Sequence, residues 1–434
     1  MGIYQYEAAF GAADKTSRAM RKAIEEWFRL YYLSDADKEQ DPCQRIAYTV
    51  VNKLTKTVFG EYAARAEDPV VQGYLQALDQ KKKEALQLAL MGGECYLKPC
   101  PVGTGFSFTL IPRNNVLIFG RNPEGEITDM GTMEKSQLGK YYFTLLERRS
   151  VDGNGYLTIT NKLYRSFTDQ NLGTQVSLRT HPGYARLADS YRFSEPVGSV
   201  GVARVKTPMV NCVDGSAGGV AVYAPAVGLI HAINRNEAQL SGEFERGQSR
   251  IIVSADMLNG GQLTDNIFVG LDEDPETVGM NIFSPPLREQ SYLARKQEYL
   301  RNVESVVGLK RGMLSDANVE ERTATEISAS NADYSLTVMD FQDMWQKTVE
   351  EAVGLCLTLA KLYDLPQAAE EGFSIDWGNG VLYDEDATWS RYMEMVQAGL
   401  LKPEVALGWR FNMKAETAEE QAAVRQKLMP NTVE

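Results

Sequence analysis

The stretch YAPAVGLIHAINRNEAQLSGEFERGQSRIIV, residues 223–253, changes from a helical to a strand pattern within one short segment. Pro225 suits a helix start, because its fixed φ and missing N–H are tolerated in the first turn. At about 1.5 Å per residue, a helix from there to about Gly247 is a rod of about 35 Å. Helical spacing predicts one narrow apolar stripe along this rod, made of Val227, Ile230, Ile233, Leu240 and Phe244.

A second rod is expected on the far side of a β-type segment. That segment, 248–286, is punctuated by Gly260-Gly261 and closed by Pro285-Pro286. Helical spacing returns from about 287 to 307, with an apolar side made of Leu293, Leu300, Val303 and Val307. Two helices of similar length therefore flank a β module that is too small to hold a core of its own.

The segment after the second rod, GLKRGMLSDANVEERTATEI at 308–327, is polar and dense in charge. It closes on a capping box, in which Thr323 accepts from the Glu326 N–H and the Glu326 side chain reaches back. A longer helix is expected from 323 to about 364, with apolar positions at Tyr334, Val338, Phe341, Trp345, Val349, Val353, Leu357 and Leu359. The residues 310–322 before it are open to three interpretations: a surface loop, a catalytic lid or the lining of a passage.

The chain before the first rod is expected to combine helices with a sheet. Asp41-Pro42 and Asp68-Pro69 each offer an acidic N-cap followed by a proline, and Gly92-Gly93 offers a left-handed helix end. The apolar period then changes to two, as in FSFTLIP, with turn signals such as NPEG at 122–125. Short strands joined by tight turns predict an antiparallel sheet, and hence an α+β fold.

Length and composition exclude several classes of protein. A chain of 434 residues has room for two or three domains, and 44% hydrophobic with 24% charged residues is ordinary for a folded protein. A net charge of -13 argues against a protein that grips nucleic acid by its phosphates, though not against one that handles nucleic acid without holding it. The five scattered cysteines form no CxxC, so we expect no disulfide framework, zinc site or other cofactor.

No membrane segment or secretion signal is expected. The opening MGIYQYEAAFGAADK lacks a basic region followed by an apolar one. The most apolar window, 218–230, contains Pro225 and is well short of the roughly 20 residues that span a bilayer. The sequence therefore predicts a protein of the reducing cytoplasm that has no membrane partner.

An enzymatic function would rest on few residues. His181 and His231 lie in no HExxH and near no nucleophile elbow, and no phosphate-binding G-x-x-x-x-G-K-[ST] occurs. Asp376 and Asp384 could form a hydrolase-type carboxylate pair under a mobile loop, 308–322. Capping of the helix that follows is the favoured interpretation of these acids, and we expect no enzymatic activity.

The order of these parts resembles one family, the portal proteins of tailed bacteriophages, in particular those of long-tailed phages and related prophages. Residues 223–253 look like a first stem helix running into a clip. GMLSDANVEERTATEI at 312–327 looks like a tunnel loop with the start of the next helix, and GLLKPEVALGWRFNMKAETAEEQ at 399–421 looks like the C-terminal end. The resemblance covers nearly the whole chain.

This resemblance implies an assignment for every part of the chain. The portal-type fold would comprise a wing of helices and antiparallel sheet at 1–224, a stem helix at 225–247, a clip at 248–286, a second stem helix at 287–309, a tunnel loop at 310–322, a long helix returning to the wing at 323–385 and a short helical crown at 386–434.

The resemblance also implies site residues. The tunnel loop would face DNA with Lys310, Arg311, Met313, Ser315, Asp316, Asn318, Glu320, Glu321 and Arg322, and the helix after it would be capped by Thr323 and Glu326. The clip would contact neighbouring copies and adaptor proteins through Ile251, Ile252, Val253, Ile267, Phe268 and Val269.

The function implied by the resemblance is a ring of about twelve copies at one capsid vertex, through which double-stranded DNA is packaged and later ejected. Its partners would be the terminase large subunit, head completion and adaptor proteins, and major capsid and scaffold proteins. It would be assembled in the bacterial host cytoplasm and end in the virion. Twelve copies at -13 carry roughly -156, which would repel DNA and keep it from sticking. A non-portal oligomeric virion scaffold or adaptor shares most of these expectations.

Overall fold

The computed structural model divides into two compact units, made of residues 1–58 with 65–373 and of residues 59–64 with 374–434. The residues that it describes are 3–32, 42–246, 250–253, 267–269, 281–283, 286–316, 324–378, 385–411, 413, 415 and 417–429.

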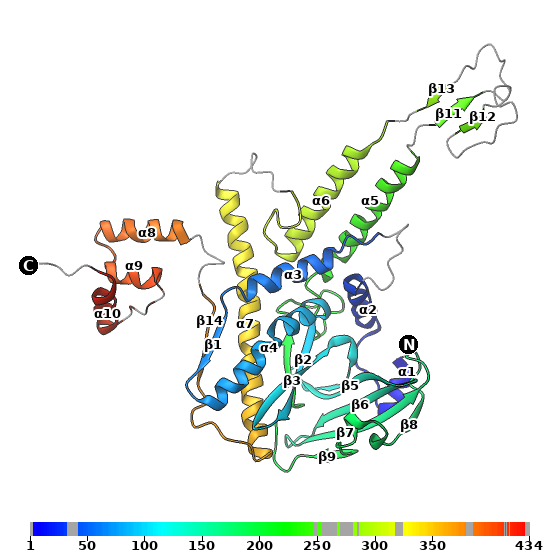
Figure 1. The fold of residues 1–434 in the computed structure, drawn as a ribbon, viewed down its shortest axis with the longest axis vertical. Helices are drawn as coiled ribbons and strands as arrows, with labels where there is room; N and C mark the ends of the chain where they lie inside the picture. The colour runs from blue at the N-terminus through cyan, green and yellow to red at the C-terminus, as the bar shows by residue number, and fades with distance from the viewer. Residues whose placement is uncertain are drawn as a thin grey trace, which may run out of the picture. The chain divides into compact units, whose positions relative to one another are not determined.

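The first unit combines helices and strands, labelled in Figure 1. Its described helices are α1 (Ile3–Phe10), α2 (Arg18–Tyr32), α3 (Ile46–Val58), α4 (Pro69–Gly92), α5 (Val227–Arg246), α6 (Glu289–Val307) and α7 (Ala324–Leu362). Its described strands are β2 (Glu94–Val102), β3 (Gly105–Pro112), β4 (Val116–Arg121), β5 (Ile127–Leu138), β6 (Tyr141–Val151), β7 (Leu157–Ser166), β8 (Thr174–Val176), β9 (Ser190–Arg192), β10 (Ala203–Lys206), β11 (Arg250–Val253), β12 (Ile267–Val269) and β13 (Asn281–Phe283). β1 (Ala63–Ala66) and β14 (Phe373–Asp376) each span a boundary between the units.

Two antiparallel sheets confirm the predicted α+β class. β10, β2 and β3 form one sheet, and β4 to β8 form the other in chain order, with β9 paired to β7. The period of two in FSFTLIP is real, because Phe106 and Phe108 are buried while Ser107 and Thr109 are exposed. α4 covers this sheet, and the Tyr74 ring meets the Phe106 ring edge-on at 5.7 Å.

The predicted caps of α4 are confirmed at both ends. The Asp68 carboxylate accepts from the N–H groups of Val70 and Val71 at 2.8 and 3.3 Å. Gly93 ends the helix in the left-handed conformation, at φ 83°, and donates to the Ala89 carbonyl. A Cβ at Gly93 would lie 2.3 Å from the Gly219 carbonyl oxygen, so close backbone packing also requires glycine there.

The predicted start of α3 is wrong. Asp41 lies outside the described residues, and the helix begins at Ile46 rather than at Pro42. Tertiary contacts hold Gln44 out of the helix: its N–H donates to the Asn234 side chain at 2.9 Å, and its side-chain carbonyl accepts from Lys296 at 3.2 Å. The backbone reaches the helix through positive φ angles of 32° at Cys43 and 57° at Arg45.

α5 and α6 lie side by side and lead to the three short strands β11, β12 and β13 (Figure 1). Their apolar stripes are only partly buried. Ile230, Ile233, Leu300 and Val303 are at most 5% exposed, whereas Phe244 is 47% and Leu293 49% exposed. The predicted stripe is therefore not buried at Phe244 and Leu293, towards the strand-side ends of the two helices.

α7 supplies much of the core of the first unit. Of its predicted apolar positions, Val338, Phe341, Trp345, Val349, Val353, Leu357 and Leu359 are buried, and Tyr334 is half-buried. The Tyr334 hydroxyl donates to the Thr57 hydroxyl of α3 at 2.6 Å. None of the described helices combines the length and the apolar character that a bilayer crossing requires.

The second unit holds the short C-terminal helices α8 (Glu385–Gln397), α9 (Pro403–Arg410) and α10 (Ala418–Leu428). α10 begins with a capping box, in which the Thr417 hydroxyl accepts from the Glu420 N–H at 3.3 Å and the Glu420 carboxylate from the Thr417 N–H at 3.0 Å. Arg425 on α10 donates to the buried Glu404 carboxylate of α9 at 2.6 Å, which fixes the packing of these two helices.

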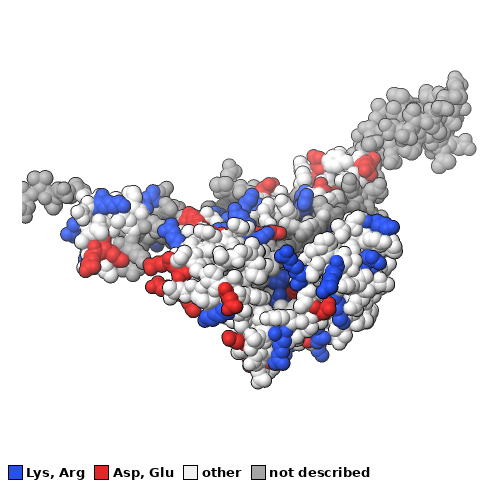
Figure 2. All heavy atoms as spheres, turned by 60° about the horizontal axis from the view of Figure 1, so that its bottom comes forward, with Lys and Arg blue, Asp and Glu red and all other residues white. Residues whose placement is uncertain are grey.

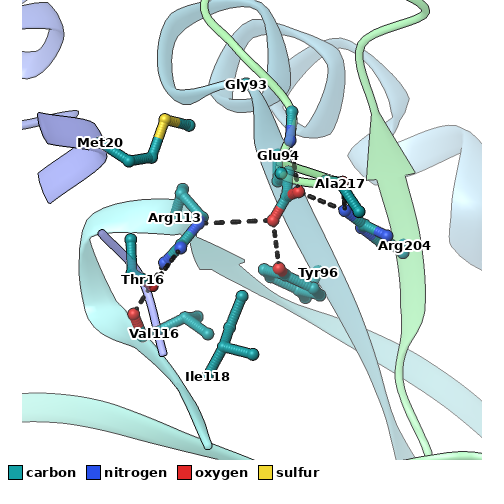
Figure 3. Close-up of polar contacts among 12 residues, drawn as sticks. Thr16, Met20, Gly93, Glu94, Tyr96, Arg113, Val116, Ile118, Arg204 and Ala217 are labelled. Atoms are coloured by element: carbon teal, nitrogen blue, oxygen red, sulfur yellow. Dashed lines mark hydrogen bonds and ion pairs between the residues drawn. The ribbon is translucent and has the colours of Figure 1, made fainter. Parts of the chain in front are cut away.

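Glu94, at the junction of α4 and β2, is fully buried in the first unit (Figure 3). Its carboxylate accepts from Arg204 of β10, from the Tyr96 hydroxyl and, at 2.6 Å, from the Gly219 N–H. The Arg113 guanidinium lies 3.4 Å from the Glu94 carboxylate and forms an ion pair with it. Arg113 donates hydrogen bonds to the Val116 carbonyl and the Thr16 hydroxyl. Burial alone would raise the pKa of Glu94, but the two guanidinium groups and the two hydrogen bonds lower that pKa to about 2.

The first prediction concerns this buried carboxylate. Because Glu94→Gln leaves two arginines beside a neutral group, we expect it to lower the free energy of unfolding by ~3–5 kcal/mol at neutral pH. The depressed pKa stabilises the fold above the ordinary value of 4.5, and this contribution is lost as pH falls towards about 2. Urea titrations at several pH values should thus show the two proteins converging in that window. An exposed control, Glu195→Gln, should stay within about 0.5 kcal/mol, and an equally acid-sensitive Glu94→Gln protein would contradict the assignment.

Candidate functional site

The polar segment singled out in the sequence begins directly at the end of α6. Gly308 caps that helix in the left-handed conformation, at φ 77°. The Leu309 N–H then donates to the Glu304 carbonyl at 2.8 Å, and the Leu309 side chain is buried. The chain thus reverses tightly and runs back along α6, instead of leaving it as an extended strand.

Glu304 holds this reversed segment from inside. Its side chain is 1% exposed, although it belongs to a charged residue on a surface helix. One carboxylate oxygen accepts from the backbone N–H groups of Gly312, at 3.1 Å, of Leu314 and of Ser315, at 2.9 Å. The other accepts from the Ser315 hydroxyl at 2.8 Å. Four donors therefore satisfy the buried charge, as a buried carboxylate requires.

A second contact extends the attachment by one residue. The Asp316 N–H donates to the side-chain carbonyl of Gln297, about two helical turns before Glu304 on α6, at 2.8 Å. A turn closed by the Met313 N–H on the Lys310 carbonyl, at 3.2 Å, lies between the two ends. We call residues 308–316 the anchored loop.

The anchored loop exposes charge on a fixed backbone. Lys310, Arg311 and Asp316 are exposed, and Met313 is half-buried. Two cations and one anion can meet a polyanion briefly without holding it tightly, because attraction and repulsion partly cancel at short range. The exposed side chains of the anchored loop can contact a charged ligand. Residues 308–316 present no exposed nucleophile with a neighbouring acid-base pair.

Ser315 is buried, whereas the sequence predicts it among the residues that line a passage. It is 6% exposed, and its hydroxyl is used by Glu304, so we remove it from the residues that could line a passage. Asn318, Glu320, Glu321, Arg322 and the capping residue Thr323 lie outside the described residues, as does the side chain of Glu326. For these the sequence expectation stands untested.

Polar contacts tie α5 to α6. Arg288 donates two hydrogen bonds to the Glu243 carboxylate, at 3.0 and 2.9 Å. The Lys296 ammonium forms an ion pair with the Glu237 carboxylate at 2.7 Å. The buried Asn236 amide donates to the Tyr292 carbonyl at 3.0 Å. These contacts fix how far one helix is shifted along the other, which apolar stripes alone specify weakly.

For the small β module, the structure describes the backbone of the three strands β11, β12 and β13. β11 pairs in parallel with β12 and antiparallel with β13. In register, Ile251 lies opposite Ile267, Ile252 opposite Phe268, and Val253 opposite Val269. The predicted contact residues therefore share one sheet, while their side chains lie outside the description.

The enzymatic alternative gains no site. Asp376 is exposed and its carboxylate accepts from the Gly378 N–H at 2.9 Å, so it stabilises a turn, and Asp384 lies outside the described residues. His231 bonds to Glu26 at 2.8 Å and links α5 to α2, and the His181 ring stacks on Tyr184. Within the described ranges, no group of three or more His, Cys, Asp or Glu side chains is placed to hold a metal ion.

Sequence reasoning missed Glu304, although a signal for it exists. Leu300, Val303, Glu304 and Val307 follow the i, i+3, i+4, i+7 pattern of a buried helical face. An acid in that pattern, next to a glycine helix end and a polar loop, indicates a carboxylate that caps the returning backbone.

Comparison with known proteins gives a family. The family model described as "Phage portal protein, SPP1 Gp6-like" matches residues 141–428. A solved structure, "Neck of native GTA particle computed with C12 symmetry", aligns with a TM-score of 0.46 at 12% identity, covering 93% of this chain and 96% of that chain. No curated protein matches the sequence.

The second prediction tests the anchored loop. Glu304→Gln exchanges charge-assisted hydrogen bonds for neutral ones, which are about half as strong. We expect hydrogen exchange at the N–H groups of Gly312, Leu314 and Ser315 to accelerate about tenfold, since 1.4 kcal/mol corresponds to one decade. The control Glu298→Gln changes an exposed acid of the same helix and should leave these amides unchanged. Equal exchange in both variants would remove Glu304 as the anchor.

Proposed function

Because the chain belongs to the SPP1 Gp6-like family of phage portal proteins, we propose that it forms the ring-shaped channel through which double-stranded DNA enters and leaves a capsid. The family match covers about two thirds of the chain and confirms the resemblance noted in its sequence. The role is structural, and the chemistry of the anchored loop agrees with it.

The observation that carries the proposal is the anchored loop. A segment that touches moving DNA must present charge while keeping its own place. Glu304 and Gln297 hold the backbone at 312–316, and Lys310 and Arg311 stay exposed. In a ring, every copy would bring the same loop to the channel wall, together with residues 317–322 that follow it.

Each part of the chain receives a role in this proposal. The wing is residues 1–224, and α5 and α6 are the stem helices of 225–247 and 287–309. The clip at 248–286 carries β11, β12 and β13 and would join neighbouring copies and adaptor proteins. The helix α7 returns to the wing within 323–385, and the short helices from 386 form the crown.

Copy number, partners and location complete the proposal. About twelve copies would close the ring at one vertex of the capsid, and the complete particle would carry it. During packaging the ring would seat the terminase large subunit, and afterwards the head completion proteins and tail. Major capsid and scaffold proteins would hold it during assembly in the bacterial host.

The excess of acidic residues supports passage rather than retention. A chain with 58 acidic and 45 basic residues gives a ring that repels DNA at long range, so duplex can slide without strong binding. Salt screens the few exposed cations of the loop beyond about 8–10 Å. They therefore act on DNA only at short range.

The third prediction separates channel function from assembly. Lys310→Glu with Arg311→Glu keeps Glu304, Gln297 and Ser315, so the loop backbone should stay in place. We expect rings of unchanged size by electron microscopy and about tenfold less packaged DNA per particle, because the loop would then repel the duplex. The control Lys22→Glu with Lys83→Glu makes the same charge change at exposed sites on α2 and α4 and should package normally. Equal packaging in both variants would remove the anchored loop from the mechanism.

A further inference from the structure

An exposed aromatic cluster lies where β6 begins and β7 ends. The Tyr141 and Phe167 rings meet with centroids 5.0 Å apart. Arg165 lies 4.6 Å from the centre of the Tyr141 ring, and the Lys140 ammonium lies 5.4 Å from it. We call Leu138, Lys140, Tyr141, Arg165 and Phe167 the aromatic tip.

The outer part of the tip is open to solvent. Phe167 is 70% exposed and Leu138 46% exposed. Tyr141, in contrast, packs against a core cluster that includes Phe143 and Leu163. A large apolar ring on a monomer surface is unremarkable alone. Here the ring contacts a half-buried tyrosine that also carries two cations, which is typical of an interface centre, where aromatic residues and arginine concentrate.

Phe167 also sits on a fixed backbone. The Thr168 N–H donates to the Ser166 hydroxyl at 3.2 Å, and Lys135 of β5 donates to the Asp169 carbonyl at 3.0 Å. Both neighbours of the ring are therefore held by hydrogen bonds. A ring presented in this way loses little entropy when a partner covers it.

The tip lies in the basic part of an acidic chain. Residues 127–192 hold nine Lys and Arg against six Asp and Glu, whereas the whole chain holds 45 against 58. Figure 2 shows this contrast on the sheet side of the first unit, where basic side chains predominate on the visible surface. A complementary partner is therefore acidic, and it offers an apolar surface to Phe167.

We propose that the aromatic tip docks onto the acidic surface of a second copy of this chain. Outside residues 127–192 the chain holds 36 Lys and Arg against 52 Asp and Glu, so a neighbouring copy would offer the tip an excess of acidic residues. A contact between two different patches of identical chains is head-to-tail and closes into a ring when the rotation allows it. The inference rests on the proposed ring and adds the patch that joins its subunits outside the clip.

The first experiment, which is the fourth prediction, reverses the charges of the tip in the full chain. Lys140→Glu with Arg165→Glu removes both cations from the Tyr141 ring, and Phe167→Ala removes the exposed ring alone. For each variant, we expect the protein concentration at which rings lose subunits to rise about tenfold, measured by mass photometry. For the charge variant, the salt dependence of assembly between about 0.05 and 1 M NaCl should also reverse, because salt weakens the attraction in the wild type and relieves the repulsion in the variant. Lys22→Glu with Lys83→Glu again provides the matched control, with the same net charge and assembly like the wild type.

A second experiment identifies what covers the tip. A photo-cross-linking amino acid in place of Phe167 should join two copies of the chain within wild-type rings, and peptide mapping should locate the adduct in an acidic stretch. The inference is overturned if rings form, the tip variants assemble like the control, and no chain-to-chain adduct appears. It is also overturned if rings are unaffected but lose binding to duplex DNA, because the tip would then serve DNA. If the wild-type chain forms no ring at all, the proposed function fails first and the inference falls with it.

Discussion

The buried carboxylate of Glu94 is the interaction on which the first unit depends. It lies at the junction of α4 and β2, and its partners come from the turn after β3, from β10 and from the loop before α5. Through Arg113, which also donates to Thr16, the network reaches the N-terminal segment. A charge without water must find donors nearby, so these distant segments are forced together at one point. Helices and sheets that could each pack in several ways thereby acquire one arrangement.

Glu304 is also a buried carboxylate that needs nearby hydrogen-bond donors, but it holds one loop instead of joining distant elements. Glu94 is neutralised by two arginines and joins separate elements of the fold, whereas the hydrogen bonds found at Glu304 come from three backbone N–H groups and a serine hydroxyl of one loop. Backbone donors cannot be exchanged by side-chain substitution, so the anchor depends mainly on the course of the chain and does not involve the exposed side chains of Lys310 and Arg311. In the proposed channel, the outward residues of the loop could contact DNA without also holding the loop in place.

Local rules predicted the elements whose causes are local. Asp68 and Gly93 delimit α4 because capping needs only neighbouring backbone groups, and the buried stripe of α7 follows from helical periodicity alone. The resemblance to portal proteins, drawn from the order of such elements, is confirmed by the family match. The prediction was wrong where remote contacts compete: Gln44 is drawn to Asn234 and Lys296, and α3 begins later than its proline suggests.

By itself, the sequence determined the α+β class, the two long helices around a small β module, the polar segment after them and the family. These follow from periodicity, caps and turn residues, which act over a few neighbouring positions. Only the tertiary structure decided that the polar segment folds back on α6, that Ser315 is buried, and that Phe167 stands exposed on Tyr141. Burial and hydrogen bonding of a side chain depend on which distant segments arrive beside it, and no local pattern in a single sequence contains that information.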